Sequence, residues 1–393
     1  MKILFLSRWF PFPINNGSKL RIYNLLHGLN QLHDVTLLSF ADQPGANPEA
    51  PEIAEICSQV KVIPWKEFNP KSVRARLAVL SLKPSSIVDT FSSGMARAIT
   101  DTLNGQKYDL VIASQLQMAA YYQFFKEVPA IFEELEIGLF YDQAFSPNGK
   151  IRLRHALTWF KLRIYLSQLL DSFRLCTVTS EQEKILVSRS FPKHELQIEV
   201  IPNCLNMDEY TYIKTEKKSN TLIFTGPFKY HVNYEAMLWF VKDIFPLILE
   251  KLPDTQLLIT GDHSGLPLPS SKNITLLGYV DDIKTLIASS TISIAPLLNG
   301  GGTRLKILEA MALGTPVIAT SKGAEGLVVN EGEHLLLADE PENFADCVVR
   351  MLMDRKLRSQ IQTNAFHLAT KKYDWSVIMP DYLRFARQVS GLE

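Results

Sequence analysis

The chain has few cysteines, no excess of either charge and no long apolar run. Its four cysteines form no CxxC pair and lie far from any histidine cluster, so neither a zinc site nor a disulfide framework is expected. Lys+Arg and Asp+Glu are equal at 41 each, which excludes bulk attraction to nucleic acid. No segment reaches the roughly 20 apolar residues of a membrane-spanning helix, and MKILFLSRWFPFP is too short an apolar start for a signal peptide. We therefore expect a cytoplasmic protein without a nucleic-acid partner.

What the chain does have is a repeated alternation of short apolar runs and helical patterns. Its 393 residues suffice for two domains of roughly 150 to 200 residues each. Continuous apolar runs of this length are typical of buried parallel strands, and their alternation with helices predicts doubly wound α/β domains. The first series of predicted strands is 3–7, 35–40, 60–63, 110–113, 130–132 and 175–179, and the second is 221–225, 256–260, 274–277, 292–295, 316–319 and 335–337.

Turn residues and the polar stretch KTEKKSN follow a predicted strand at 198–201, so the domain boundary is expected there. We predict an N-terminal domain at 1–205, a C-terminal domain at 206–373 and a final amphipathic helix within 374–393 that packs back toward the first domain. A cleft between the two domains is the default place for a ligand.

The stretch GGGTRLKILEAMALGTPVIAT, which starts at Gly300, carries the strongest local signal. Gly300, Gly301 and Gly302 lack Cβ atoms, so their backbone N–H groups can converge on an anion. Thr303 is the predicted N-cap of the helix that follows, and Gly314 ends it. This order of residues predicts a phosphate-binding loop.

Arg304 and Lys306 lie in the predicted first helical turn, where the helix dipole disfavours cations unless an anion such as a diphosphate is bound. Glu309, one turn later, is suited to accept both hydroxyls of a ribose. The alternative is a plain connecting loop in which Lys306 and Glu309 form an exposed i,i+3 pair.

Three segments of the C-terminal half resemble glycosyltransferase family 4, within the GT-B glycosyltransferases. They are FTGPFKYHVNYEAMLWF, LLGYVDDIKTLIASSTISIAPL, and GGGTRLKILEAMALGTPVIAT followed by KGAEGL. The N-terminal half is similar more loosely, through PFPINNGSKLRIYNLL, YDLVIAS and VIPNCLNMDEY. The resemblance implies two Rossmann-like domains, a UDP- or GDP-linked sugar donor on the C-terminal domain, an acceptor on the N-terminal domain, and transfer with retention of configuration.

The same resemblance assigns roles to donor-site residues and shows departures from the family pattern. Glu309 matches the second Glu of the family's Glu, seven residues, Glu motif, while Gly301 stands in the place of the first. The Arg and Lys that usually follow the first glycine of the donor domain are missing after Gly226, where Lys229 is the only nearby cation. Gly17, which opens the first predicted helix, matches a glycine near the donor phosphates, although one glycine is also the mark of an ordinary turn.

Acidic residues follow the predicted strand at 130–132, in the segment EELEIG. Glu133, Glu134 and Glu136 are candidates for a general base or for contacts to acceptor hydroxyls, and a solvated acidic loop is the alternative. Leu135 occupies the place where relatives often have a histidine. Glu325 is a candidate contact to a sugar hydroxyl, with a turn or cap role as the alternative.

A basic, aromatic and helix-compatible stretch contains no Asp or Glu from 143 to 170. Such a surface suits anionic lipid headgroups or a polyprenyl-linked acceptor, and the alternative is a solvated helix whose cations cover apolar surface. The residues concerned are Lys150, Ile151, Arg152, Leu153, Arg154, Leu157, Trp159, Phe160, Lys161, Arg163 and Tyr165, with a second basic stretch of Lys71, Arg74, Arg76 and Lys83.

The function expected from the resemblance is a retaining glycosyltransferase that makes a surface polysaccharide or glycolipid. A catalytically silent nucleotide-sugar-binding partner protein and a GT-B sugar-nucleotide epimerase are the alternatives. We expect no cofactor and no required metal, because no DxD-like motif is placed to bridge a diphosphate and Asp281–Asp282 belong to the "VDDI" segment.

Overall fold

The computed structural model describes residues 1–41, 46–145, 153–192, 196–210, 213, 215–300 and 304–392. They form two compact units: the first combines Met1–Pro202 with Met379–Glu393, and the second is Asn203–Ile378. The limits expected from the sequence lay after residues 205 and 373, close to these. The final segment, from Met379 on, is part of the first unit.

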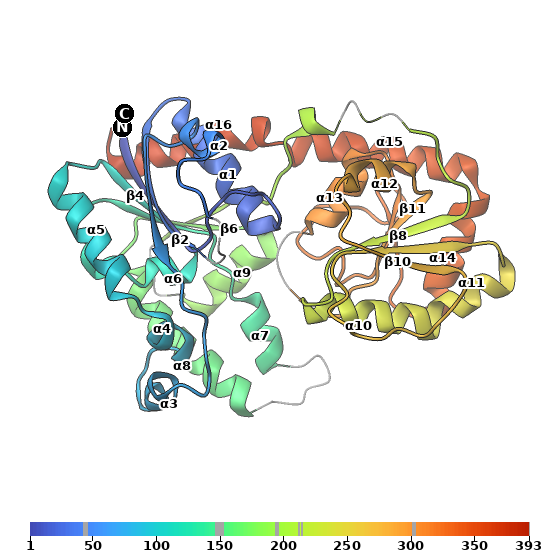
Figure 1. Cartoon of the computed structure of the whole chain (residues 1–393), viewed down its shortest axis with the longest axis horizontal. Helices are drawn as coiled ribbons and strands as arrows, with labels where there is room; N and C mark the ends of the chain where they lie inside the picture. Colours follow the sequence, from blue (N-terminus) through green and yellow to red (C-terminus); the bar gives the residue numbers. More distant parts are fainter. Residues whose placement is uncertain are drawn as a thin grey trace. The chain divides into compact units, whose positions relative to one another are not determined.

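The first unit is built on a parallel sheet with strand order β3-β2-β1-β4-β5-β6-β7. Figure 1 shows β2, β4 and β6 of this sheet with helices around them. Leu4 and Leu6 belong to the core cluster on one face, while Ile3 and Phe5, equally buried, point to the other face. Both faces are therefore covered, as predicted for a doubly wound sheet. The strands are β1 (Lys2–Ser7), β2 (Asp34–Ala41), β3 (Gln59–Pro64), β4 (Leu110–Ser114), β5 (Ala130–Glu133), β6 (Leu175–Val178) and β7 (Gln197–Val200).

Several helices of the first unit begin at a side chain that caps them. Asn16 accepts a hydrogen bond from the Lys19 N–H at the start of α1, and Ser92 and Ser180 cap α5 and α9 in the same way. The helices are α1 (Gly17–Asn30), α2 (Pro51–Ala54), α3 (Val73–Leu77), α4 (Ser85–Thr90), α5 (Ser93–Gly105), α6 (Gln115–Ala119), α7 (Gly138–Ala144), α8 (Leu153–Leu170) and α9 (Glu181–Ser190), with short 3₁₀ turns η1 (Ala78–Leu80) and η2 (Tyr122–Phe124).

The second unit has a smaller parallel sheet, in the order β10-β9-β8-β11-β12-β13. Its strands are β8 (Thr221–Thr225), β9 (Gln256–Thr260), β10 (Ile274–Gly278), β11 (Ile292–Ala295), β12 (Val317–Ala319) and β13 (Leu336–Leu337). Its helices are η3 (Met207–Glu209), α10 (His231–Trp239), the π-helix η4 (Phe240–Ile244), α11 (Phe245–Lys251), α12 (Ile283–Ser289), α13 (Leu305–Ala312), α14 (Pro341–Met353) and α15 (Arg355–Lys372), and α16 (Trp375–Ser390) continues into the first unit.

Two strands depart from the predicted burial. β3 and β10 were expected to be buried, but each is the edge strand of its sheet. Leu276 and Leu277 of β10 are 45% and 38% exposed. An edge strand has a neighbour on one side only, so an apolar run does not by itself guarantee burial.

No helix in the described ranges is both long and apolar enough to span a bilayer.

Candidate functional site

The sheet of the second unit reverses its strand order between β8 and β11. Ligands of open parallel α/β sheets bind beside the carboxyl ends of the strands at such a point. Gly226 directly follows β8, and Gly300 lies between β11 and α13. Gly226 and Gly300, both predicted for the donor site, thus lie where the topology favours a ligand.

Gly226 lies beside the half-buried Lys306. Its φ is +137°, and a Cβ there would come within 2.6 Å of Asn233 Nδ2 and 3.2 Å of Lys306 Nζ. Lys306 Nζ donates to Asn233 Oδ1 at 2.9 Å and lies 4.1 Å from the centroid of the Phe224 ring. Burial and the charge of Arg304 lower the pKa of the Lys306 ammonium to about 7. The Lys306 ammonium therefore bonds to the neutral Asn233 side chain, lies beside the Phe224 ring and is close to the backbone of Gly226.

Gly300 is held by the second cation of the loop. Its φ is +100°, and a Cβ there would lie 3.2 Å from both Arg304 Nη1 and Tyr230 Oη. Arg304 is 7% exposed, and its Nη2 donates to the Gly300 carbonyl at 2.7 Å. The loop after β8, which carries Tyr230, and the loop before α13 therefore meet at Gly300.

The prediction of Thr303 as N-cap was wrong. Helix α13 begins at Leu305, and Arg304 occupies the cap position with φ −84° and ψ 84° and no side-chain cap. The backbone at Arg304 is not yet helical, so the helix starts later than predicted. Gly301, Gly302 and Thr303 themselves lie outside the described residues.

Glu309 lies one turn after Lys306 but does not share its partner. The Tyr210 hydroxyl donates to Glu309 Oε1 at 3.4 Å, and burial raises the pKa of the carboxyl. Both Lys306 and Glu309 are half-buried. The alternative of an exposed i,i+3 pair is therefore wrong for these two residues.

The remaining donor-site candidates of the second unit are more peripheral. Lys229 is exposed in the turn after β8. Glu325 Oε2 lies 2.5 Å from Lys322 Nζ in the turn after β12, and the Glu325 N–H donates to the Lys322 carbonyl at 3.4 Å. This local contact favours the turn role for Glu325.

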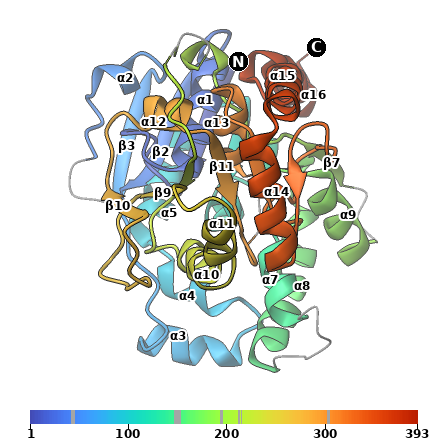
Figure 2. The same ribbon diagram turned by 90° about the vertical axis from the view of Figure 1, so that its right-hand side faces the viewer.

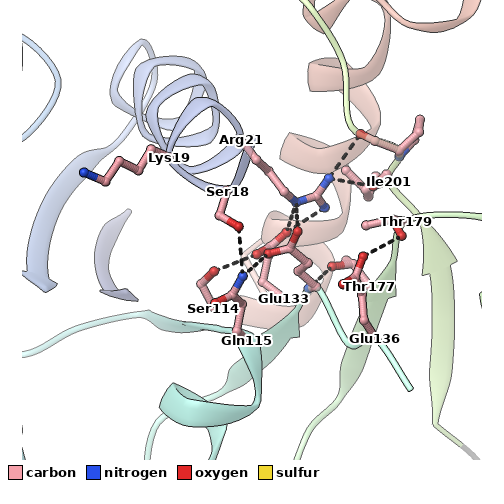
Figure 3. Close-up of polar contacts among 12 residues, drawn as sticks. Ser18, Lys19, Arg21, Ser114, Gln115, Glu133, Glu136, Thr177, Thr179 and Ile201 are labelled. Carbon is pink, nitrogen blue, oxygen red and sulfur yellow. Dashed lines mark hydrogen bonds and ion pairs between the residues drawn. The ribbon is translucent and has the colours of Figure 1, made fainter. Parts of the chain in front are cut away.

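The sheet of the first unit reverses its strand order between β1 and β4. Helix α1 follows β1 and begins at Gly17, which is not among the glycines with positive φ. Ser18 lies in the first turn of α1, and Gln115 Nε2 donates to its hydroxyl at 3.5 Å (Figure 3). Gly17 is thus placed at the ligand edge of the sheet in an ordinary helical start.

Glu133, the last residue of β5, is fully buried in an ion pair. Arg21 Nη2 lies 2.6 Å from Glu133 Oε1, and Ser114 Oγ donates to Oε2 at 2.9 Å. Arg21 also donates through Nη1 to the carbonyls of Ile201 at 2.8 Å and Pro202 at 3.1 Å (Figure 3). Both carboxylate oxygens are engaged inside the unit, so we do not retain Glu133 as a residue that contacts a substrate.

Glu134 has a different environment from its neighbour. Its backbone is left-handed, with φ +60°, and its Oε2 accepts a hydrogen bond from Gln115 Nε2 at 2.8 Å. Burial and the charge of Glu133 raise the pKa of Glu134 to about 8, although Arg21 lowers it. A carboxyl group that titrates near neutrality at the carboxyl edge of the sheet is suited to proton transfer.

Glu136 is exposed and accepts a hydrogen bond from Thr179 Oγ1 at 3.4 Å, while Leu135 points into the core with 1% exposure. The alternative of a solvated acidic loop therefore describes Glu136 alone. In the described residues no three His, Cys, Asp or Glu side chains are grouped so as to hold a metal ion. That the reaction needs no metal or cofactor stays a prediction.

Comparisons with known proteins agree with this arrangement. Residues 219–354 match the family model described as glycosyl transferases group 1. An uncharacterized 44.6 kDa protein in the cps region of Klebsiella pneumoniae is 23% identical over 95% of this chain and 96% of its own length. The phosphatidyl-myo-inositol mannosyltransferase of Mycobacterium leprae is 30% identical over 48% of this chain and 53% of its own length, so the match spans about half of that enzyme.

Solved GT-B structures match the whole chain. Sucrose-phosphate synthase from Thermosynechococcus elongatus has a TM-score of 0.72 at 16% identity, with all of both chains covered. Anabaena HepE in complex with UDP-glucose has a TM-score of 0.68 at 17% identity and covers 99% of this chain and 100% of its own. This chain is a glycosyltransferase with the GT-B fold, and its residues 219–354 match the group 1 family. Its placement in family 4 stays a prediction.

Several residues of the glycosyltransferase were missed from its sequence. Arg21, Gln115, Tyr210 and Asn233 each bond to a predicted site residue. Asn233 lies in the first turn of a helix after Gly226, and Tyr210 ends the VIPNCLNMDEY segment, so both had a positional signal. Arg21 lies within the PFPINNGSKLRIYNLL segment and had the same kind of signal, whereas Gln115 had none.

Proposed function

We propose that the glycosyltransferase takes a sugar from a UDP- or GDP-linked donor bound by its second unit. It transfers that sugar, with retention of configuration, to a hydroxyl of a glycan or lipid-linked acceptor bound by its first unit, in the synthesis of a surface polysaccharide or glycolipid. One observation carries this proposal: Lys306, Arg304 and the left-handed Gly226 and Gly300 meet at the strand-order reversal of the second sheet.

The donor diphosphate lies against the backbone of Gly226 and Gly300, with Lys306 and Arg304 as its counter-charges. Tyr210 donates to Glu309 Oε1, and the other carboxylate oxygen of Glu309 accepts from the ribose hydroxyls in this proposal. Nucleotide sites of α/β proteins use backbone N–H groups and an acidic side chain in these roles. HepE, which shares the fold, was crystallised with UDP-glucose.

In the transfer, the bond from the sugar C1 to the diphosphate oxygen breaks, and the acceptor oxygen bonds to C1 on the same face. The proton of the acceptor hydroxyl passes to the departing diphosphate, or first to Glu134. Lys306 and Arg304 stabilise the charge on the leaving group, which is where fixed cations contribute most to such a barrier.

A calorimetric panel of UDP, GDP and ADP tests the donor site. One nucleotide should bind, and Lys306→Ala should weaken it about 10- to 100-fold, since one charge-assisted hydrogen bond contributes about 1.5 to 3 kcal/mol. Glu309→Ala should weaken the nucleotide, and less so the free diphosphate. The exposed Lys242 and Glu250 of the same unit supply matched controls, Lys242→Ala and Glu250→Ala, which should bind as the wild type does.

Absence of binding by all three nucleotides would overturn the donor assignment. Binding followed by release of free nucleotide and an altered sugar without any acceptor would favour the epimerase alternative instead.

We propose in addition that the first unit contacts an anionic membrane through a surface formed by α3, η1 and the outer side of α8, the α3–α8 surface. Leu80 is 91% exposed there, and Leu153 is 85% exposed. Lys161 Nζ of α8 donates to the Ala78 carbonyl of η1 at 3.3 Å. Both views show α3 and α8 at the same end of the unit (Figure 1, Figure 2). Trp159 and Tyr165, predicted for this surface, are buried in the core instead.

The same surface is basic as well as apolar. The exposed cations are Lys71, Arg74, Arg76, Lys83 and Arg154, and the exposed apolar side chains are Val73, Leu77, Leu80, Leu82, Leu153, Leu157 and Phe160. Lys150, Ile151 and Arg152 lie outside the described residues. Exposed apolar side chains beside cations suit an interface with anionic lipid.

Sedimentation with liposomes tests this contact. Vesicles with an anionic lipid should bind the protein more strongly than purely zwitterionic vesicles, and Leu80→Ser with Leu153→Ser should abolish the difference. Leu32→Ser is the matched control, because Leu32 is 56% exposed but lies in the turn after α1. Equal binding to both kinds of vesicle would contradict the proposal.

A further inference from the structure

Two neighbouring strands of the first unit end in the same unusual conformation. Ser114 of β4 pairs with Glu133 of β5, so the residues that follow them, Gln115 and Glu134, leave the sheet side by side. Both have left-handed backbones, with φ +66° at Gln115 and +60° at Glu134. Such a conformation costs about 1 to 3 kcal/mol for a residue with a side chain, and it clusters at functional sites.

Side-chain hydrogen bonds hold this pair in place. Gln115 Nε2 donates to Glu134 Oε2 at 2.8 Å, and its bond to Ser18 reaches the first turn of α1 (Figure 3). The Glu134 N–H donates to Thr177 Oγ1 at 3.0 Å, and the Leu135 N–H donates to the Thr177 carbonyl at 2.9 Å. Helix α1 thus contacts the Gln115 side chain, while β6 holds the backbone at Glu134 and Leu135.

The nearest cation to Glu134, Arg21, bonds mainly to Glu133 instead. Arg21 Nε is 3.9 Å from Glu134 Oε1, but the guanidinium bonds closely to Glu133. Glu136 adds a further negative charge from the same loop, and Tyr382 of α16 faces the Arg21–Glu133 pair. The direct hydrogen bond to the Glu134 side chain therefore comes from the uncharged amide of Gln115.

An amide is suited to hold a carboxyl group that must exchange a proton. A lysine or arginine in its place would pair with the carboxylate and suppress its basicity, whereas an amide N–H fixes its direction and stabilises the charged form only modestly. Glutamine is thus the residue type that orients a base without neutralising it.

We propose that Gln115 is a positioning residue that holds the Glu134 carboxyl group toward an acceptor hydroxyl. This inference rests on the proposed transfer reaction and names the residue that orients its candidate base. Gln115 acts through Glu134.

The first test is a titration that needs no substrate. The side-chain carbon signals of ¹³C-labelled glutamates are followed against pH, and the Glu134 signal is identified by its loss in Glu134→Gln. Gln115→Met removes the N–H donor at similar length and should raise the midpoint of the Glu134 titration by about 0.5 to 1 pH unit. Gln117→Met, the same change in the same helix, should leave it unchanged.

The second test follows turnover. Release of nucleotide from the sugar nucleotide selected by calorimetry, with water as acceptor, should show an acid limb that moves to higher pH in Gln115→Met by the same amount, while the nucleotide Kd stays as in the wild type. Gln115→Gly relieves the left-handed strain while it removes the amide, so it should shift both titrations even where Gln115→Met folds poorly.

An unshifted Glu134 midpoint in both variants overturns the inference, and so does a shifted midpoint with an unmoved acid limb. Failure of any sugar nucleotide to bind or turn over instead overturns the proposed function, and the carbon titration still decides whether Gln115 controls Glu134.

Discussion

The residues at the strand-order reversals of the two sheets differ in how their charges are paired. In the first unit, the carboxylate of Glu133 and the guanidinium of Arg21 neutralise each other, and main-chain carbonyls take the remaining donors. In the second, the described neighbours of Lys306 are a neutral amide and a ring, with the Glu309 carboxyl favouring its charge from one turn away, and Arg304 bonds to carbonyls. In the first arrangement a carboxylate bonds directly to the cation, whereas in the second the cations bond to neutral groups, which favours an anion beside them. The same topology can therefore serve either the fold or an anion.

The largest effect is expected from breaking the completed pair. Arg21→Met leaves the Glu133 carboxylate buried without its counter-charge, which should lower the free energy of unfolding by about 3 to 5 kcal/mol. Urea unfolding measures the loss. The double variant Arg21→Met with Glu133→Gln should regain most of it, and a double variant no more stable than Arg21→Met would contradict the charge-based explanation.

The glycines at the two reversals should respond unequally to the same substitution. Gly226→Ala places a Cβ 2.6 Å from Asn233 Nδ2 at φ +137°, so it should lower stability by about 1 to 3 kcal/mol and weaken the nucleotide more than tenfold. Gly17→Ala, at an ordinary helical start, should leave stability unchanged or raise it slightly. Thermal unfolding and calorimetry compare the two. Equal losses of stability and nucleotide affinity in the two variants would contradict the proposed difference between the two strand-order reversals.

Replacing Lys306 should change the free energy of unfolding less, and in the opposite direction. Burial lowers the Lys306 pKa to about 7 from 10.5, so its charge destabilises the empty fold fully below pH 7, and this cost is relieved as the pH rises toward 10.5. Lys306→Met should therefore raise the free energy of unfolding by about 1 kcal/mol near pH 6 and by less near pH 9. Denaturation at both pH values checks this against Lys242→Met. A Lys306→Met variant less stable than the wild type at pH 6 would be the contrary result.

The smallest effect is expected from Tyr210→Phe, which removes only the hydroxyl that bonds to Glu309. Nucleotide affinity should fall by about two- to fivefold, in line with a neutral donor at 3.4 Å, and stability should hardly change. Calorimetry with the nucleotide measures it. Unchanged affinity would show that Glu309 needs no such support.

Much of the fold, and which residues gather at the candidate donor site of the second unit, could be predicted from the sequence, because both depend on contiguous residues. Buried parallel strands appear as apolar runs, and Gly300, Lys306 and Glu309 lie within one loop and helix. The partners were harder, since Gln115 lies 19 residues from Glu134, Asn233 lies 73 from Lys306 and Arg21 lies 112 from Glu133. The local sequence also does not show that Glu133 is buried and paired while Glu136 is exposed, because burial depends on the tertiary structure.

The first unit is made of two chain segments, so it can complete its folding only after the second segment has been synthesised. Its last element, from Met379 on, packs on α1, where a Cβ on Gly28 would come within 2.3 Å of Met379 Cε. The ribosome must first make the intervening 203–378, which takes roughly 10 to 35 s at about 5 to 20 residues per second. The later-made unit is thus a contiguous piece that can fold first, while in the earlier-made unit Gly28 of α1 lacks its Met379 neighbour until the end of the chain is made.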